Sequence, residues 1–305
     1  MTIIFFTVNN IHKKGEFYMN CRTDIALERH ELLNDNECEG VIFNQEKTEK
    51  AVITTIEILD ERGEKALGKS KGKYITIDLP EFSHESELLD SRLTAITKTI
   101  KDLLPQNAQT ILVAGLGNES ITPDALGPFC AKQIFATRHI EKSLQKTLEL
   151  PTLRPVVAVS TGVLGQTGIE TAEYIKGIAN IVDPDAVIVI DALASRKISN
   201  LGKTVQLSNT GISPGAGVGN YRKAIDKSTL GIPVISMGVP TVVDGRTIVH
   251  DLTKNQAELP NEADELMVTP RDIDSIIDRA AKLLALSINC ALQPDFQPEM
   301  FLALS

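Results

Sequence analysis

Closely spaced cysteines, an excess of positive charge and long apolar runs are all missing from this sequence of 305 residues. The net charge of -9 argues against a general affinity for nucleic acid or for an anionic membrane. No segment approaches the eighteen or more apolar residues that a membrane span needs, so a soluble chain is expected. The four cysteines lie far apart without a C-x-x-C pair, which favours reduced thiols in the cytosol over a disulfide framework or a zinc site. These cysteines, expected to be mostly buried and inert, are Cys21, Cys38, Cys130 and Cys290.

Several catalytic and binding signatures are missing as well. The five histidines show no metal-ligand spacing and no H-E-x-x-H motif, and no G-x-S-x-G nucleophile elbow is present. The stretch "GLGNES" begins like a dinucleotide fingerprint, but Ser120 stands where the third glycine belongs. The stretch "SPGAGVGN" (213–220) lacks the Lys-Ser/Thr ending of a phosphate loop, so a tight loop near the site is the favoured interpretation. We therefore expect neither a metal nor a cofactor.

The sequence does contain a regular alternation of strand and helix signals. The continuous apolar strands "TILVAGLG", "PVVAVS" and "DAVIVIDAL" are separated by stretches of helical character at about 124–138 and 170–181. This alternation predicts an α/β fold, with a mostly parallel sheet and helices on both faces. "TVQLS" and "IPVISMGV" predict further strands.

Other elements are predicted on either side of this alternating region. "AVITTIEIL" and "KYITIDL" flank a polar, glycine-containing connection and predict an N-terminal β-hairpin subdomain at about 50–80. Apolar residues at helical spacing then predict a helix that stops at Pro105. Near the end, Thr269 as N-cap, Pro270 at the first helical position and Asp272 predict a helix that begins with a capping box.

Two acidic residues follow strands of the predicted sheet. Asp124 follows "TILVAGLG" and is expected in the first turn of the next helix, where the helix dipole lowers its pKa and Thr122 is the cap, whereas Asp191 ends "DAVIVI". Ligands bind at the carboxyl ends of the strands in such sheets. Two carboxylates brought together there cannot both ionise easily, so one holds a proton while the other acts as a base that activates water. Helix stabilisation or capping is the competing interpretation for each residue alone.

Several short motifs occur together and in the same order as in one known family. They are "RTDIALE", "GKYITIDLP", "GLGN" followed by "TPDALGP", "TGIET", "DALASR", "TGISPGAGVGN" and "MVTP" before the last helix. On these motifs, which run from about Arg22 to the last helix, the chain resembles the germination proteases of spore-forming bacteria. Composition and spacing alone indicate only a hydrolase with a pair of carboxylates.

The resemblance implies an endopeptidase made as an inactive zymogen, which processes itself and at germination degrades small acid-soluble spore proteins. It also implies a fold like that of hydrogenase maturation proteases, a homotetramer, and a place in the forespore or spore core without direct binding to nucleic acid or membrane. Carried over by motif, the catalytic residues are Asp124 and Asp191. The same motifs imply propeptide cleavage between Asp24 and Ile25, although Asp24 is also a suitable helix N-cap.

These expectations divide the chain into a leader or propeptide, 1–24, and a single α/β peptidase domain, 25–305, with the hairpin insertion at about 50–80. Two other functions stay open: a nickel-dependent peptidase of the hydrogenase-maturation type, and an inactive relative that only binds spore proteins. The long hairpin and the "RTDIALE" segment argue against the first. The presence of both aspartates argues against the second.

The start of the chain carries a separate expectation. Lys14-Gly15-Glu16 can be encoded by a purine-rich ribosome-binding sequence, at a suitable distance before a Met19 codon. We therefore expect residues 1–18 to be untranslated leader, with Met19 rather than Met1 as the true start.

Overall fold

The computed structural model describes residues 23–33, 39–48, 51–80, 82, 88–219, 222–245, 247–249 and 266–303. The expected start at Met19 and the two thiols Cys21 and Cys38 lie outside the described residues, and so does the leader 1–18.

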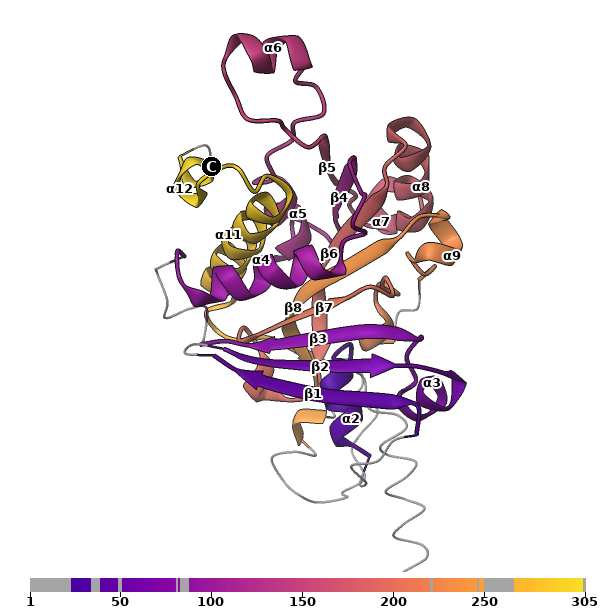
Figure 1. Ribbon diagram of the computed structural model, residues 1–305. Coiled ribbons are helices and arrows are strands. Elements are labelled where there is room, and N and C mark those ends of the chain that lie inside the picture. The colour runs from indigo at the N-terminus through magenta and orange to yellow at the C-terminus, as the bar shows by residue number, and fades with distance from the viewer. Residues whose placement is uncertain are drawn as a thin grey trace, which may run out of the picture.

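A single mixed sheet organises the described part of the chain (Figure 1). Its strands follow the order β1-β2-β3-β7-β8-β6-β4-β5, and β9 pairs with β8 outside this path. The strands are β1 (Val41–Lys47), β2 (Val52–Ile58), β3 (Gly72–Asp78), β4 (Ile111–Gly115), β5 (Val156–Ser160), β6 (Ala186–Ser195), β7 (Thr204–Ser208), β8 (Val234–Asp244) and β9 (Met267–Val268).

The parallel half of the sheet is the part that the alternating pattern predicted. Strands β5, β4, β6 and β8 pair in parallel, and the side chains of β4 and nearly all of those of β6 and β8 are buried. Continuous apolar strands are typical of a sheet covered on both faces. The five strands predicted between Thr110 and Val239 are therefore confirmed, together with the α/β class.

The other half of the sheet is antiparallel, so the sheet is mixed rather than mostly parallel. The predicted pairing of β2 with β3 is present, but β3 also pairs with β7, and β7 with β8, which makes the hairpin continuous with the main sheet. β1, which was not predicted, adds to the outer edge of β2. The connection expected as a loop contains helix α3 (Glu61–Leu67), because Asp60 caps its first turn and Gly68 ends it at a φ of 60°.

Helices cover both faces of the parallel half (Figure 1). On one face α5 packs on β4 and β6, and α11 packs on α5 and α4, in one apolar cluster that includes alternate residues of β4 and β6 such as Ile111 and Ile188. On the other face α8 packs on the residues between them, including Leu112 and Val187. The helices of these two layers are α4 (Ser91–Leu103), α5 (Leu126–Ala131), α8 (Thr171–Val182), α9 (Lys227–Leu230) and α11 (Ile273–Leu292).

Two predicted helices differ in detail from the structure. The helix expected at about 124–138 ends at Ala131, because the N–H groups of Gln133 and Ile134 donate three residues back and the Phe135 N–H donates to Asn289 Oδ1 on α11. The predicted capping box at Thr269 is wrong. α11 begins at Ile273 after Asp272, and the Thr269 hydroxyl instead donates to the Thr241 carbonyl at 2.8 Å.

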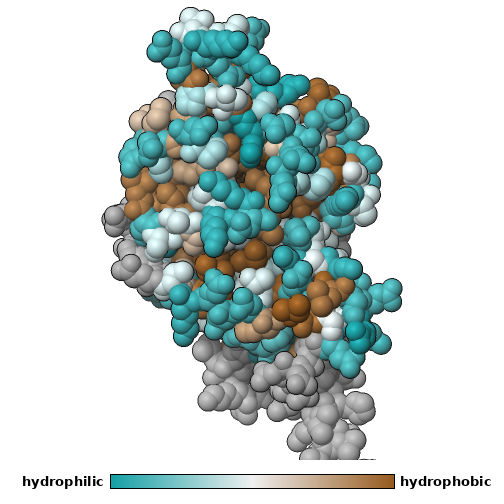
Figure 2. Space-filling view, in the orientation of Figure 1, coloured by the Kyte–Doolittle hydropathy of each residue, from teal (hydrophilic) through white to brown (hydrophobic). Residues whose placement is uncertain are grey.

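Short helices connect or extend this framework. The helix α6 (Lys142–Thr147) projects from the sheet at the top of Figure 1, and the surface there is mainly hydrophilic in Figure 2. Among the described residues, no helix has the length and apolar character needed to cross a membrane. The remaining short helices are α2 (Ala26–Glu31), η2 (Thr122–Asp124), α7 (Leu164–Thr167), η3 (Ile198–Asn200), η4 (Ala216–Val218) and α12 (Pro298–Leu302).

Candidate active site

The site lies where β4 stops and β6 continues. β4 pairs with β6 only as far as Gly115 opposite Ile190, whereas β6 runs on to Ser195. Beyond that point Asp24 contacts the edge of β6 that β4 leaves open: its N–H donates to the Ala194 carbonyl at 2.9 Å, and the Ala194 N–H donates to its carboxylate at 2.9 Å. One backbone and one side-chain hydrogen bond therefore attach Asp24 to this sheet edge.

Asp124 lies in the 3₁₀ turn η2, beside the end of β4. Its carboxylate accepts a hydrogen bond from the Asn118 N–H at 2.7 Å. Burial raises the pKa of Asp124 despite this hydrogen bond, so the net shift is upward rather than the lowering expected from a first helical turn. Thr122 is not the cap either, since η2 follows Ile121 and has only three residues. An added Cβ at Gly117, whose φ is 112°, would lie 2.1 Å from the Asp124 carbonyl oxygen, so this glycine permits the close approach.

Asp191 lies within β6 rather than at its end, and its side chain is buried, with 7% of its surface exposed. Burial raises the pKa of Asp191 well above its usual value, and the negative charges of Asp124 and of Asp24 raise it further. The charges of the other predicted aspartate, Asp124, and of Asp24 thus both act on Asp191. Sequence reasoning did not predict this third carboxylate beside the pair.

The Asp24 carboxylate is held by backbone groups. It accepts hydrogen bonds from the N–H groups of Ala194 and Gly217, the second of which belongs to the short helix η4. Burial raises the pKa of Asp24, while the nearby charge of Lys69 and these two N–H groups act in the opposite direction. Asp24 does not cap helix α2, whose N-cap is Ile25 without a side-chain hydrogen bond. The N-cap alternative is therefore excluded.

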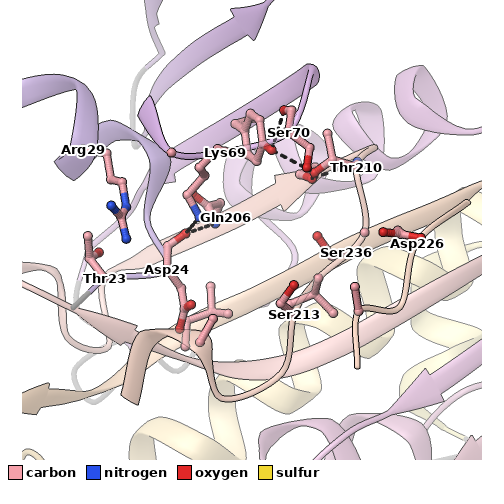
Figure 3. A pocket seen from close by; sticks show the side chains of 18 of the residues that line it. Thr23, Asp24, Arg29, Lys69, Ser70, Gln206, Thr210, Ser213, Asp226 and Ser236 are labelled. Atoms are coloured by element: carbon pink, nitrogen blue, oxygen red, sulfur yellow. Dashed lines mark hydrogen bonds between the residues drawn. The ribbon is translucent and has the colours of Figure 1, made fainter. Parts of the chain in front are cut away.

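Hydrogen bonds hold the backbone on either side of the Asp24–Ile25 peptide bond. The Asp24 carbonyl accepts hydrogen bonds from Lys69 Nζ at 2.7 Å and from Gln206 Nε2 at 2.8 Å (Figure 3). The Ala26 N–H donates to Gln206 Oε1 at 2.6 Å, and the Ile25 side chain is fully buried. Neither Lys69 nor Gln206 was predicted, because nothing in the local sequence links them to Asp24.

Glu28 anchors helix α2 next to this segment. Its fully buried carboxylate accepts hydrogen bonds from five groups and forms no ion pair among the described residues. The carboxylate therefore ties α2 to the chain that leaves β6. The five donors are the hydroxyls of Thr23 and Ser195, the N–H groups of Arg196 and Lys197, and the side-chain amide of Asn200.

A polar cavity of about 520 Å³ opens beside the Asp24 carbonyl. Figure 3 shows Lys69 and Gln206 on its wall next to Asp24, with Ser213, Ser236 and other polar side chains further along. The two donors to the Asp24 carbonyl are thus accessible from the cavity as well as from the bound segment.

Cysteine and metal chemistry find no support among the described residues. Cys130 and Cys290 are both buried and unpaired, and burial raises the pKa of both thiols, that of Cys290 to about 11. Thiolates are the reactive form, so these cysteines are inert at neutral pH, as expected. The described ranges contain no group of three or more His, Cys, Asp or Glu side chains arranged to hold a metal ion.

Comparisons with known proteins place the chain among the peptidases. A family model described as Peptidase_A25, germination protease, matches residues 21–255. The chain belongs to the germination protease family. It is 42% identical to a germination protease of Clostridium perfringens over 90% of this chain and 96% of the relative, and 44% identical to one of Caldanaerobacter subterraneus subsp. tengcongensis over 90% and 95%.

One solved structure is also similar. It is a [NiFe] hydrogenase maturation protease, HycI, from Thermococcus kodakarensis, with 18% sequence identity, a TM-score of 0.35, and coverage of 62% of this chain and 98% of that chain.

Proposed function

We propose that this protein is an endopeptidase, made as a self-processing zymogen, that degrades small acid-soluble spore proteins during germination. Family membership supports a spore protease. One observation supports the mechanism: burial and the negative charges of Asp124 and Asp24 raise the pKa of Asp191 well above its usual value. The backbone contacts agree with this, because the Leu116 N–H donates to the Ile190 carbonyl at 2.8 Å and the Asp24 N–H donates to the Ala194 carbonyl at 2.9 Å, both on the strand β6 that carries Asp191.

The proposed reaction uses the carboxyl pair as acid and base. Asp191 keeps a proton, because it is the more deeply buried of the two and has two negative neighbours. Asp124, whose ionised form is stabilised by the Asn118 N–H, takes a proton from water. The water oxygen bonds to the carbonyl carbon, the C–N bond breaks, and the leaving amine receives the proton from Asp191.

Self-processing is expected between Asp24 and Ile25. The residues Thr23-Asp24-Ile25-Ala26 lie at the site with the Asp24 carboxylate, its carbonyl and the Ala26 N–H all hydrogen-bonded. Incubation of the full chain should yield a product that begins Ile-Ala-Leu-Glu, detected by N-terminal sequencing and intact mass. The Asp191→Asn chain is the control and should stay uncut. A product that begins at another residue would contradict the proposed cleavage site.

The loop that holds the Asp24 carboxylate gives a second test. A Cβ added to Gly217 would lie 2.2 Å from Asp24 Oδ2, so Gly217→Ala must displace the acidic side chain from its two N–H donors. A misplacement of about 1 Å can cost on the order of 10²-fold in rate, and we expect self-processing to slow by about that factor. The rate is measured by mass spectrometry of the product.

Gly165→Ala is the matched control for this test, because nothing lies within 4 Å of an added Cβ there. Equal processing rates for Gly217→Ala, Gly165→Ala and the unmodified chain would show that the Asp24 carboxylate needs no such pocket.

Two further properties belong to the same proposal. We propose a homotetramer that acts in the forespore or spore core, with spore proteins as substrates and without a cofactor. Sedimentation of the processed chain tests the assembly.

Cleavage of a spore-protein peptide with and without nickel separates this function from the alternatives. A nickel-dependent peptidase would need the metal, and an inactive relative would cut under neither condition.

A further inference from the structure

The Asp24 carbonyl lies between two side-chain hydrogen-bond donors. Its oxygen accepts from a lysine ammonium at 2.7 Å and from a glutamine amide at 2.8 Å. We propose that Lys69 and Gln206 form the oxyanion-binding site of this peptidase, for the propeptide and for protein substrates alike. This inference rests on the proposed function, because it takes the Asp24–Ile25 peptide bond as the one that is cut.

The two donors come from separate elements that the fold brings together. Lys69 follows the glycine that ends α3, and its ammonium lies 5.7 Å from the centre of the Tyr74 ring on β3. Gln206 lies on β7, which pairs with β3. The Ala26 N–H donates to Gln206 Oε1, and this fixes the amide with its NH₂ group toward the Asp24 carbonyl.

The chemistry requires such a site. When water bonds to the carbonyl carbon, the electron pair of the C=O bond moves to the oxygen, which becomes an oxyanion until the C–N bond breaks. Donors already aimed at this oxygen stabilise the charge as it develops, and the loss of one donor typically costs about 10²- to 10³-fold in rate. A lysine ammonium contributes a full positive charge in addition to its hydrogen bond.

Lys69 has an environment suited to this role. Burial and the charge of Arg29 lower its pKa, the charges of Asp24 and Glu28 raise it, and the balance puts its pKa at about 8. The ammonium form is the stronger donor to an oxyanion, so the rate should fall as the pH rises through about 8. Arginine stays charged at every pH tested, so Lys69→Arg should keep its remaining activity above that pH.

A purely structural role makes different predictions. If Lys69 and Gln206 only fasten the uncut segment, their loss weakens the docking of residues 23–26 but leaves the turnover of a separate peptide unchanged. If they bind the oxyanion, kcat for a peptide containing Thr-Asp-Ile-Ala, the sequence of residues 23–26, falls while KM changes little. The split between kcat and KM therefore distinguishes the two roles.

Self-processing is measured on the full chain with Lys69→Met, Lys69→Arg and Gln206→Leu, and peptide turnover is measured on the same variants in chains that start at Ile25, where no uncut segment competes. Lys73→Met and Gln45→Leu are matched controls on neighbouring strands: Lys73 pairs with Glu57 at 3.8 Å, and Gln45 donates to Thr54 at 3.0 Å. Thermal unfolding checks that each variant is folded. We expect about 10²- to 10³-fold slower self-processing and lower kcat for Lys69→Met and Gln206→Leu, with both controls unchanged.

The outcomes separate this inference from the proposed function. If the unmodified chain cuts at Asp24–Ile25, Asp191→Asn does not, and folded Lys69→Met and Gln206→Leu cut at near-normal rates, the oxyanion site is refuted while the proposed function stands. The oxyanion site is likewise refuted if these variants change KM alone. If the unmodified chain leaves Asp24–Ile25 intact, the self-processing itself is refuted. If Lys69→Met does not fold, Gln206→Leu and the pH profile of Lys69→Arg decide.

Discussion

Asp191→Asn and Asp124→Asn should each slow cleavage of a peptide containing Thr-Asp-Ile-Ala, the sequence of residues 23–26, by about 10²- to 10⁴-fold, the usual contribution of general acid-base catalysis. Self-processing of the full chain should be lost to the same extent. An amide can neither hold the proton that Asp191 is proposed to donate nor accept the one that Asp124 is proposed to take. Because the two carboxyls act as one unit, the double variant should lose little more than either single variant.

The free energy of unfolding of the Asp191→Asn chain is the control that separates lost catalysis from lost folding. The pKa of Asp191 is raised in the folded state, so its contribution to stability is fully present below the unfolded pKa and is lost as the pH rises through the folded pKa. At pH 7 the Asp191→Asn chain should therefore be at least as stable as the unmodified one, and its stability should vary less above pH 4. Urea unfolding across this pH range measures the effect.

The activity assay can also be run on a chain that starts at Ile25, which bypasses processing. Near-normal turnover by either folded Asn variant would mean that the carboxylate is structural. Helix stabilisation or capping would then be its role.

Glu28→Ala should lower the free energy of unfolding by about 3 kcal/mol or more, the largest effect on stability that we expect from a single side chain near the site. The substitution leaves five donors without their shared acceptor, and each buried donor left unsatisfied costs about 1 to 3 kcal/mol. The total stays below the simple sum because the Ser195 hydroxyl also donates to the Lys197 carbonyl at 2.9 Å and the Lys197 N–H also donates to Ser195 Oγ at 3.0 Å. Urea denaturation at constant m-value measures the change.

Glu31→Ala is the matched control, one turn further along helix α2. Glu31 pairs with Lys197 at the surface, where both side chains are more than one-third exposed. Exposed ion pairs contribute about 0 to 1 kcal/mol, so this change should have little effect. The rate of self-processing should fall in Glu28→Ala and stay unchanged in Glu31→Ala, in parallel with their free energies of unfolding, because α2 carries the residues just after the proposed cleavage point. A Glu28→Ala chain as stable as Glu31→Ala would show that the buried carboxylate is dispensable.

The sequence predicts the parallel half of the fold well because its signal is local. The strands β4, β5 and β6 are continuous apolar runs, and the rule that ligands bind at strand ends selects Asp124 and Asp191. The family motifs add the cleavage position at Asp24. These predictions need no knowledge of which distant segments pair.

The other half depends on long-range pairing, which single-sequence patterns do not encode. β3 meets β7 across more than a hundred residues, and only that pairing brings Gln206 and Lys69 to the Asp24 carbonyl. For the same reason the sequence does not indicate a special role for Glu28, which has the pattern of an ordinary polar helix residue. Its five donors come mostly from the chain after β6 and are brought to it by the tertiary fold.

The attachment of Asp24 to the sheet edge also has a consequence for how activity would be turned on. A tethered ligand competes at an effective concentration that is on the order of millimolar for short flexible links, whatever the amount of protein in the compartment. Before the cut, a spore protein would have to displace this covalently linked competitor from β6. After the cut, the released N-terminal piece and the rest of the chain are separate molecules. The released piece then competes for β6 only at its bulk concentration. Hydrolysis of a single peptide bond would thus change the competition at the site by mass action, without any movement of the catalytic residues.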